Sequence, residues 1–248
     1  MLWNISGLHG YSIKASDGEI GSVANFLFSD ADWRIKWLVA DTGDWLPGRR
    51  VLLHPSLFGK PDAQSRQFAV GLTRQQVEDS PHISTDKPVS RLMEERLYDY
   101  YSWDPTWGAN FALSGAMAGA LSEPLFESVL RTDAGCGDPH LRSAAEVSGY
   151  HIHAKDGDIG HVGDFLVGDE GWTIRYLKVE TSNWWMGETV LISPRAIGKI
   201  DWSERMATVN LTRAEIKASK PYHRVDTVDG AFEEMALLTS NMNWIAPL

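Results

Sequence analysis

The sequence predicts a mainly β protein with two homologous small antiparallel β-barrels, each followed by a short helix, and a partly helical linker. A stretch beginning at Gly10, GYSIKASDGEIG, returns at Gly149 as GYHIHAKDGDIG. The two repeats then run in register without a gap, with roughly 30 identities in about 71 aligned positions. Short β-branched and aromatic runs recur between turn residues in both repeats, which is typical of small barrels.

The first repeat divides into short expected strands. Asp17-Gly18 is a tight-turn pair that favours a hairpin, and Gly21 lies where a strand must bulge or bend. A single helical turn is expected at 56–59, directly after Pro55. The strands are expected at 11–15, 20–28, 34–41, 51–53, 60–63 and 67–71.

Each repeat ends in the same signal for the start of a helix. Thr73-Arg-Gln-Gln76 and Thr212-Arg-Ala-Glu215 match the capping box. In this motif the threonine hydroxyl accepts from a backbone N–H, and the Gln or Glu reaches back to the backbone of the threonine. Both repeats are therefore expected to close with a short helix.

The domain boundaries follow from the repeat. Residues 1–80 form the first barrel domain, 81–140 a helix and linker, 141–219 the second barrel domain, and 220–248 a C-terminal helical tail. A helix is expected at 88–101 because its apolar residues recur at helical spacing. The segment 102–137 has lower complexity, with one loose helix at 111–121, and a short helix is expected at 232–238.

Composition excludes several classes of partner. The formal net charge of −10 disfavours nucleic acid and anionic membrane surfaces, because both attract clustered Lys and Arg. The longest apolar stretch, at 109–121, is too short to span a bilayer, so no integral membrane segment is expected. A single cysteine and the lack of a signal peptide favour the cytoplasm.

The ordered motif Gly-Tyr-x-Ile-x-Ala-x-Asp-Gly-x-Ile-Gly is followed by Phe-Leu, by Trp-x-Ile, by a Trp-bearing loop and by Val-Leu-(Leu/Ile)-x-Pro. This pattern resembles the PRC-barrel family, which includes the cytoplasmic domain of the photosynthetic reaction centre H subunit and the C-terminal domain of the ribosome maturation factor RimM. The resemblance covers both repeats and implies about six antiparallel strands in each. It also implies a protein-binding or regulatory role rather than catalysis.

Tryptophans in the loop of each repeat are the first candidate site. Trp45 and Trp184 match between repeats, which favours rings that plug the end of a barrel. Trp185 and Met186 replace Leu46 and Pro47 of the first repeat, which favours contact with a partner. On the linker helix, the candidate interaction residues are Leu97, Tyr100 and Tyr101.

Residues capable of catalysis or metal binding differ between the repeats. His151, His153 and His161 face Ser12, Lys14 and Ser22, and a metal needs three or four converging ligands. Cys136 lies in a Gly-rich linker without a pocket that would lower its pKa. No catalytic residue, metal or cofactor is therefore expected.

Two functions remain open at this stage. The first is a non-enzymatic, cytoplasmic protein-interaction or regulatory module, related through the family resemblance to H-subunit-like roles, with homodimerisation as an option. The alternative is a small-molecule-binding regulatory protein with a Trp- and Tyr-lined pocket between the barrels. An enzyme ranks last, because no convergent polar constellation is visible in the sequence.

Overall fold

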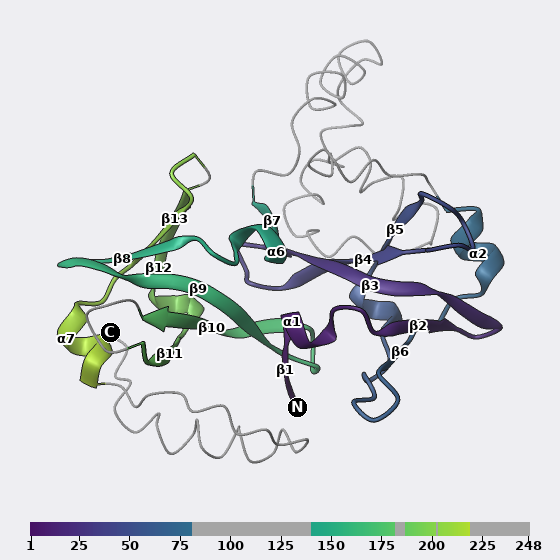
Figure 1. Cartoon of the computed structure of the whole chain (residues 1–248), viewed down its shortest axis with the longest axis horizontal. Coiled ribbons are helices and arrows are strands. Elements are labelled where there is room, and N and C mark those ends of the chain that lie inside the picture. Colours follow the sequence, from purple (N-terminus) through teal and green to yellow (C-terminus); the bar gives the residue numbers. More distant parts are fainter. Residues whose placement is uncertain (81–139, 182–186, 202, 219–248) are drawn as a thin grey trace, which may run out of the picture.

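The computed structural model describes residues 1–80, 140–181, 187–201 and 203–218. These ranges contain two β-sheets that lie side by side along the long axis of the molecule, one for each repeat (Figure 1). We call residues 10–80 the first half and residues 149–218 the second half. The expected helices at 88–101, 111–121 and 232–238, and the residues Trp184, Trp185 and Met186, lie outside the described residues.

The first half builds a sheet in the order β5-β4-β3-β2-β6. A 3-10 turn, η1 (Pro55–Leu57), follows β5, and the helix α2 (Arg74–Glu78) closes the half. The expected capping box of α2 is confirmed, because Thr73 Oγ1 accepts from Gln76 N and Gln76 Oε1 accepts from Thr73 N. The strands are β2 (Ser12–Ala15), β3 (Gly18–Ser29), β4 (Ile35–Asp41), β5 (Arg50–Leu53) and β6 (Gln67–Ala69).

The second half repeats this order as β11-β10-β9-β8-β13, and β12 adds to β13. It has its own 3-10 turn, η2 (Pro194–Ala196), and its own closing helix, α7 (Arg213–Ala218). The helices α2 and α7 lie at opposite outer ends of the molecule (Figure 1). The strands are β8 (His151–Ala154), β9 (Gly157–Gly168), β10 (Thr173–Thr181), β11 (Thr189–Ile192), β12 (Ile197–Asp201) and β13 (Met206–Val209).

Strand direction differs from the all-antiparallel expectation at one place in each half. β2 pairs with β6 in parallel, and β8 pairs with β13 in parallel. The reason is that the chain crosses the half after β5 or β11 and returns beside the first strand in the same direction. The pairings between described strands do not close either sheet into a barrel. The expected strand at 60–63 is reduced to one isolated bridge, Asp62 with Gln67.

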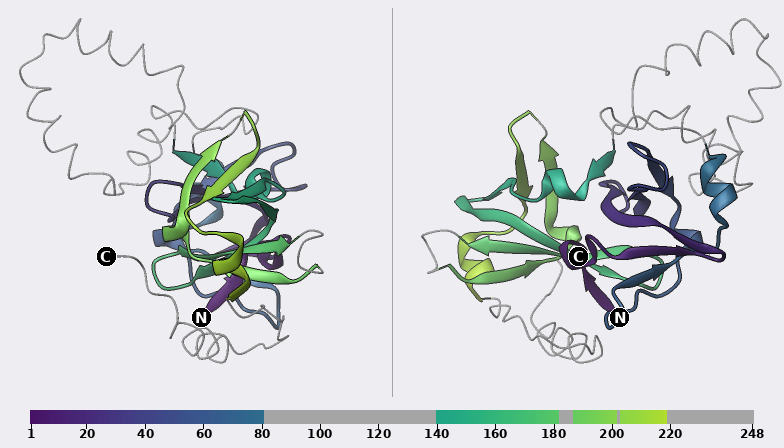
Figure 2. Two further views of the ribbon diagram at one scale, coloured as in Figure 1. Left: turned by 90° about the vertical axis from the view of Figure 1, so that its left-hand side faces the viewer. Right: turned by 45° about the vertical axis from the view of Figure 1, so that its right-hand side comes forward.

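The segments in front of the two repeats are exchanged between the halves. β1 (Leu2–Asn4) and the short helix α1 (Ile5–Leu8) precede the first half, yet β1 pairs with β9 of the second half. β7 (Leu141–Ser143) and α6 (Ala144–Val147) precede the second half, yet β7 pairs with β3 of the first half. All four lead elements therefore lie at the centre of the molecule (Figure 1; Figure 2).

Backbone pairing at the centre marks an approximate two-fold axis. Arg34 forms a β-bridge with Thr173, which is its own equivalent in the second repeat. Ile35 N donates to Trp172 O at 2.8 Å, and Ile174 N donates to Trp33 O at 2.8 Å. These reciprocal bonds make the contact isologous in form, as in a two-fold dimer.

Trp172 crosses this axis and fills the core of the first half. Its ring stacks with Phe26, and it lies 5.0 Å from Phe58 and 5.3 Å from Phe68 between ring centroids. Only 5% of the tryptophan is exposed, although its φ of 47° is in the left-handed region that favours glycine. Buried side chains of both halves consequently form one cluster rather than two separate cores.

Replacing Trp172 by alanine is expected to lower the free energy of unfolding by about 3–5 kcal/mol, because it leaves a large cavity in the shared core. Trp33→Ala is the matched control, since Trp33 has the same backbone conformation but is only half-buried. Denaturant unfolding followed by circular dichroism measures both. Equal losses for the two variants would contradict the unequal role of the two rings.

Gly21 is required by a close approach of two strands, beside the bulge between β2 and β3 that the sequence predicted. An added Cβ would lie 2.0 Å from Asp41 O, and φ is 134°. We expect Gly21→Ala to cost about 3 kcal/mol or more of unfolding free energy. Gly43→Ala is the control, with φ of 55° and no atom within 4 Å, and it should cost about 1 kcal/mol. Thermal or denaturant unfolding compares them, and a smaller loss for Gly21→Ala would be the contrary result.

Candidate functional site

The tryptophan loop of the first half, residues 42–49, joins β4 to β5 and is held by its own hydrogen bonds. Thr42 Oγ1 donates within the loop to Leu46 O at 2.7 Å and to Arg49 O at 2.6 Å. Gly43 and Gly48 have positive φ, which the two turns of the loop require. The loop is therefore a preorganised structure at the outer end of the half.

Trp45 is half-buried and packs against the hydrophobic core. The guanidinium carbon of Arg74 lies 4.7 Å from the centroid of its ring. Since one face meets the core and a cation covers the ring, the geometry supports the reading of Trp45 as a plug at the end of the half. Its equivalent Trp184, with Trp185 and Met186, lies outside the described residues, and so do Leu97, Tyr100 and Tyr101.

Arg49 ties the loop to the end of α2. Its guanidinium donates to Glu78 O at 2.6 Å and also to Ser80 O. A cation at a helix C-terminus satisfies carbonyls that have no partner inside the helix and interacts favourably with the helix dipole. The loop is thus hydrogen-bonded to the last described residues before position 81. The second half has Glu188 at the equivalent position, so this contact belongs to the first half alone.

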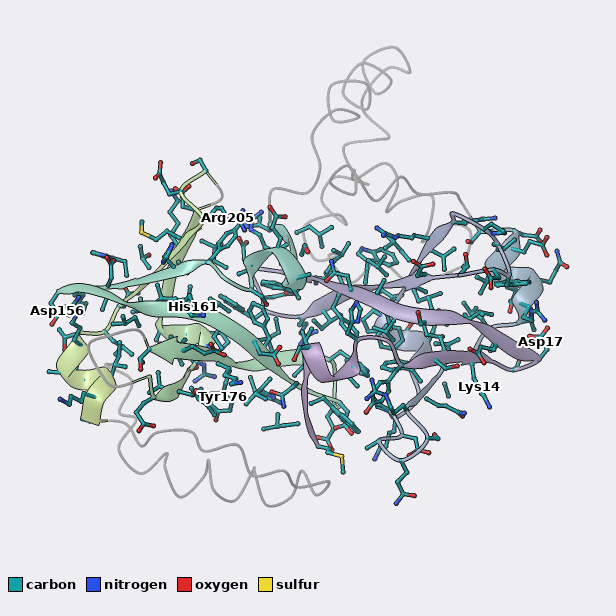
Figure 3. The ribbon with its side chains drawn as sticks, viewed as in Figure 1. Lys14, Asp17, Asp156, His161, Tyr176 and Arg205 are labelled. Carbon is teal, nitrogen blue, oxygen red and sulfur yellow. The ribbon has the colours of Figure 1, made fainter. Side chains whose placement is uncertain are left out.

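The Asp-Gly turns have a structural role in both halves. Asp17 Oδ1 accepts from Arg74 N at 2.7 Å, and Asp156 Oδ1 accepts from Arg213 N at 2.7 Å. Each hairpin tip therefore supplies a carboxylate to the N-terminus of the closing helix of its own half. The labelled Asp17 and Asp156 lie at opposite ends of the molecule (Figure 3).

The glycine of each turn leaves room for the arginine that follows the cap. A Cβ on Gly18 would lie 3.1 Å from Arg74 Cδ, and one on Gly157 would lie 2.7 Å from a guanidinium nitrogen of Arg213. The residues of the Asp-Gly motif and of Leu-Thr-Arg therefore act together, although they are far apart in the sequence. These contacts give the residues a structural role in both repeats.

The histidines of the second half form separate pairs. His151 lies directly across from His161 on β8 and β9, but His161 Nε2 lies 3.3 Å from Glu180 Oε2. His153 Nδ1 lies 2.6 Å from Asp158 Oδ1, and this hydrogen bond holds the pKa of the Asp158 carboxyl below its usual range. Within the described residues, no group of three or more His, Cys, Asp or Glu is arranged to hold a metal.

His54 is a buried imidazole at the end of β5, and only 8% of it is exposed. Its Nδ1 accepts from Ser56 N at 3.2 Å, and its ring meets Trp37 edge-on at 5.6 Å between centroids. Burial, with a smaller contribution from the charge of Lys36, lowers the pKa of His54 to about 4. The sequence analysis did not single out His54, because the burial of a side chain is not visible in a local pattern.

The centre between the halves is filled by side chains. Trp172 and the phenylalanines around it occupy the place where the alternative hypothesis expected a Trp- and Tyr-lined pocket. Phe28 and Phe165 also meet across the two halves, with their ring centroids 5.3 Å apart. The described part of this contact therefore has the character of a protein core.

Comparison with known proteins adds no family assignment. No protein-family model matches the chain, and no curated protein is significantly similar to it. Among the described residues, no helix is long and apolar enough to cross a membrane.

Because His54 is buried, the free energy of unfolding is expected to decrease as the pH is lowered. The unfolded imidazole takes up a proton near pH 6.5 and the folded one only near pH 4, so the unfolded chain binds more protons between these values. We expect His54 to leave the free energy of unfolding unchanged above pH 6.5. At pH 4 it should have lowered that free energy by about 3 kcal/mol. Unfolding free energies measured from pH 7 to pH 4 report the loss.

The control for this measurement is His54→Asn, which keeps an acceptor for Ser56 N but does not titrate. The difference between the wild type and this variant isolates His54 from the carboxyl groups that titrate in the same range. Parallel pH profiles for the two proteins would rule out a buried, neutral His54.

Proposed function

We propose that the chain is a non-enzymatic protein-interaction module, built from two PRC-barrel-like halves that form one rigid body. The supporting observation is that the residues shared by both repeats have structural roles. Asp17 and Asp156 cap helices, Gly21 and Gly160 allow close strand contact, and Trp172 fills a core. Selection of this kind preserves a shape, which is the requirement of a binding scaffold.

The contact surfaces in this proposal are the loop 42–49 of the first half and the residues that match it in the sequence of the second half. In the first half, Thr42 and Arg49 hold the loop in one conformation, with Pro47 exposed. A preorganised loop loses little conformational entropy when it binds, so the cost of ordering the loop reduces the binding free energy only slightly. In the second half, the positions equivalent to Leu46 and Pro47 are Trp185 and Met186, which are residue types enriched at interfaces.

The partner in this proposal is a protein. The resemblance to the reaction centre H subunit suggests an H-subunit-like role as its specific form, in which the module docks on a larger complex. The net charge of −10 favours a partner surface with a basic patch. The aromatic packing between the halves makes the alternative, a small-molecule pocket at that position, the less favoured function.

The test compares two matched double variants of the full chain. Trp185→Ser with Met186→Ser replaces the two apolar residues of the second repeat, and Leu46→Ser with Pro47→Ser replaces their equivalents in the first repeat. A tagged chain is cross-linked in its native cell and captured, and the proteins it retains are quantified by mass spectrometry. We expect the first variant to lose about 10-fold or more of the specific partner, as removal of a hot spot does, and the second variant to lose less.

Thermal unfolding of both variants checks that neither loss reflects misfolding. Equal retention by the wild type and the Trp185/Met186 variant would overturn the proposed surface. A rise in melting temperature with small metabolites, without any retained protein, would favour the small-molecule alternative instead.

A further inference from the structure

The contact between the two halves is built from polar groups as well as from apolar ones. Asp164 is a buried carboxylate of β9 that accepts from Ser6 N at 3.1 Å, Ser6 Oγ at 2.6 Å and Phe165 N at 2.8 Å. Asn25, its equivalent on β3, accepts from Ala145 N at 3.2 Å and donates to Ser143 Oγ at 2.8 Å. Asp164 of the second half thus holds α1, which precedes the first half. Asn25 of the first half holds α6, which precedes the second half.

Ion pairs join the lead segments to the opposite halves, and those on the two sides differ. Asp30 lies at the end of β3, where its backbone N–H donates to His140 O at 2.9 Å. Its carboxylate oxygens lie 2.7 Å from Arg142 Nε and 2.7 Å from His140 Nδ1. On the other side Asp169, the equivalent of Asp30, lies 2.7 Å from the amino group of Met1. The equivalent of Arg142 there is Trp3, so the guanidinium–carboxylate pair belongs to one side. The two lead segments therefore differ in the cations that they present.

The apolar side chains at the contact also differ in size between the halves. The first half contributes Phe28, Phe58 and Phe68, and the second half has Val167, Ile197 and Ala207 at the equivalent positions. Trp172 fits the phenylalanine-lined site that the first half offers. A pair of two first halves would bring two sets of phenylalanines to one axis, and a pair of two second halves would leave that space unfilled. Both overpacking and cavities destabilise a core.

We define the seam as the contact formed by the exchanged lead segments, β3, β9, Trp33 and Trp172. From these contacts we infer that the seam is a surface by which the two unlike halves of this chain recognise each other. Its partner is the complementary half of this chain, supplied by the same molecule or by a second molecule that exchanges halves with it. The halves hold together without a covalent link, and like halves do not pair. The linker raises the effective concentration of the cis partner, so exchange with a second molecule needs a broken link or a high protein concentration.

The test uses the full chain with a protease recognition sequence inserted between Gly135 and Cys136. After cleavage, confirmed by denaturing electrophoresis, the protein is passed over a size-exclusion column at micromolar concentration. We expect the two fragments to elute together at the size of the intact chain. Separate elution of fragments that keep their β circular dichroism would overturn the inference.

Pairing preference is measured by native mass spectrometry. Cleaved protein grown with heavy nitrogen is mixed with unlabelled cleaved protein, unfolded in urea and refolded. The expected products are pairs of unlike fragments, in which labelled and unlabelled halves mix at random. A comparable amount of paired first fragments or paired second fragments would contradict the preference for unlike halves.

Two variants assign the binding energy to the seam. Trp172→Ala in the cleaved protein is expected to raise the dissociation constant of the fragments about 100-fold or more, and the uncleaved variant shows whether the chain still folds. Asp30→Arg and Arg142→Asp are each expected to weaken the pairing, and their combination to restore it in part. A double variant no tighter than either single one would show that this ion pair has no part in recognition.

Discussion

The insertion of Trp172 into the first half is the interaction on which the rest of the structure depends. Each half is small and buries a limited apolar area alone, which makes a self-contained core difficult to stabilise. The exchanged tryptophan, with the exchanged lead segments, joins the two sets of buried side chains into one cluster. Trp33 and Trp172 share a left-handed backbone conformation, and Trp172 places its ring among Phe26, Phe58 and Phe68 of the other half.

Apolar packing alone would not fix how the halves meet, because it has little directional preference. Buried polar groups supply the direction. Asp164 and Asn25 each occupy one position along a long bent strand and accept from a backbone N–H near the start of an exchanged helix. A shift of a lead segment by one residue would leave the buried Asp164 and the half-buried Asn25 without these backbone partners. The lost hydrogen bonds would raise the free energy of the shifted arrangement.

The positions that the two repeats share, and those at which they differ, are relevant to function. The two repeats keep the side chains that connect each hairpin to its closing helix. They differ in the loop after the third strand of each repeat, where Leu46 and Pro47 are replaced by Trp185 and Met186. The unlike sizes of the seam residues suggest that, after duplication, the repeats adapted to each other rather than to a copy of themselves.

Much of the fold could be predicted from sequence because its signals are local. The Asp17-Gly18 hairpin, the bulge beside Gly21 and the Thr73 capping box each depend on residues within one turn or one strand, where backbone sterics and short hydrogen bonds decide the conformation. The exchange of Leu2–Asn4 and Leu141–Ser143 between sheets was missed. A weak signal existed, since apolar residues occur at equivalent positions in both lead segments, for example Ile5 with Ala144 and Leu8 with Val147.

The sequence by itself determined the repeat, most strands of the two halves, the Asp-Gly turns and the capping boxes, because each of these is a property of neighbouring residues. Only the tertiary structure decided which sheet each lead strand joins, where Trp172 is buried, and that Asp17 caps a helix far along the chain. These features depend on pairing between distant segments, where many partners satisfy the same local pattern. The choice among them is made by the fit of side chains such as Phe58 and Phe68 around a single ring.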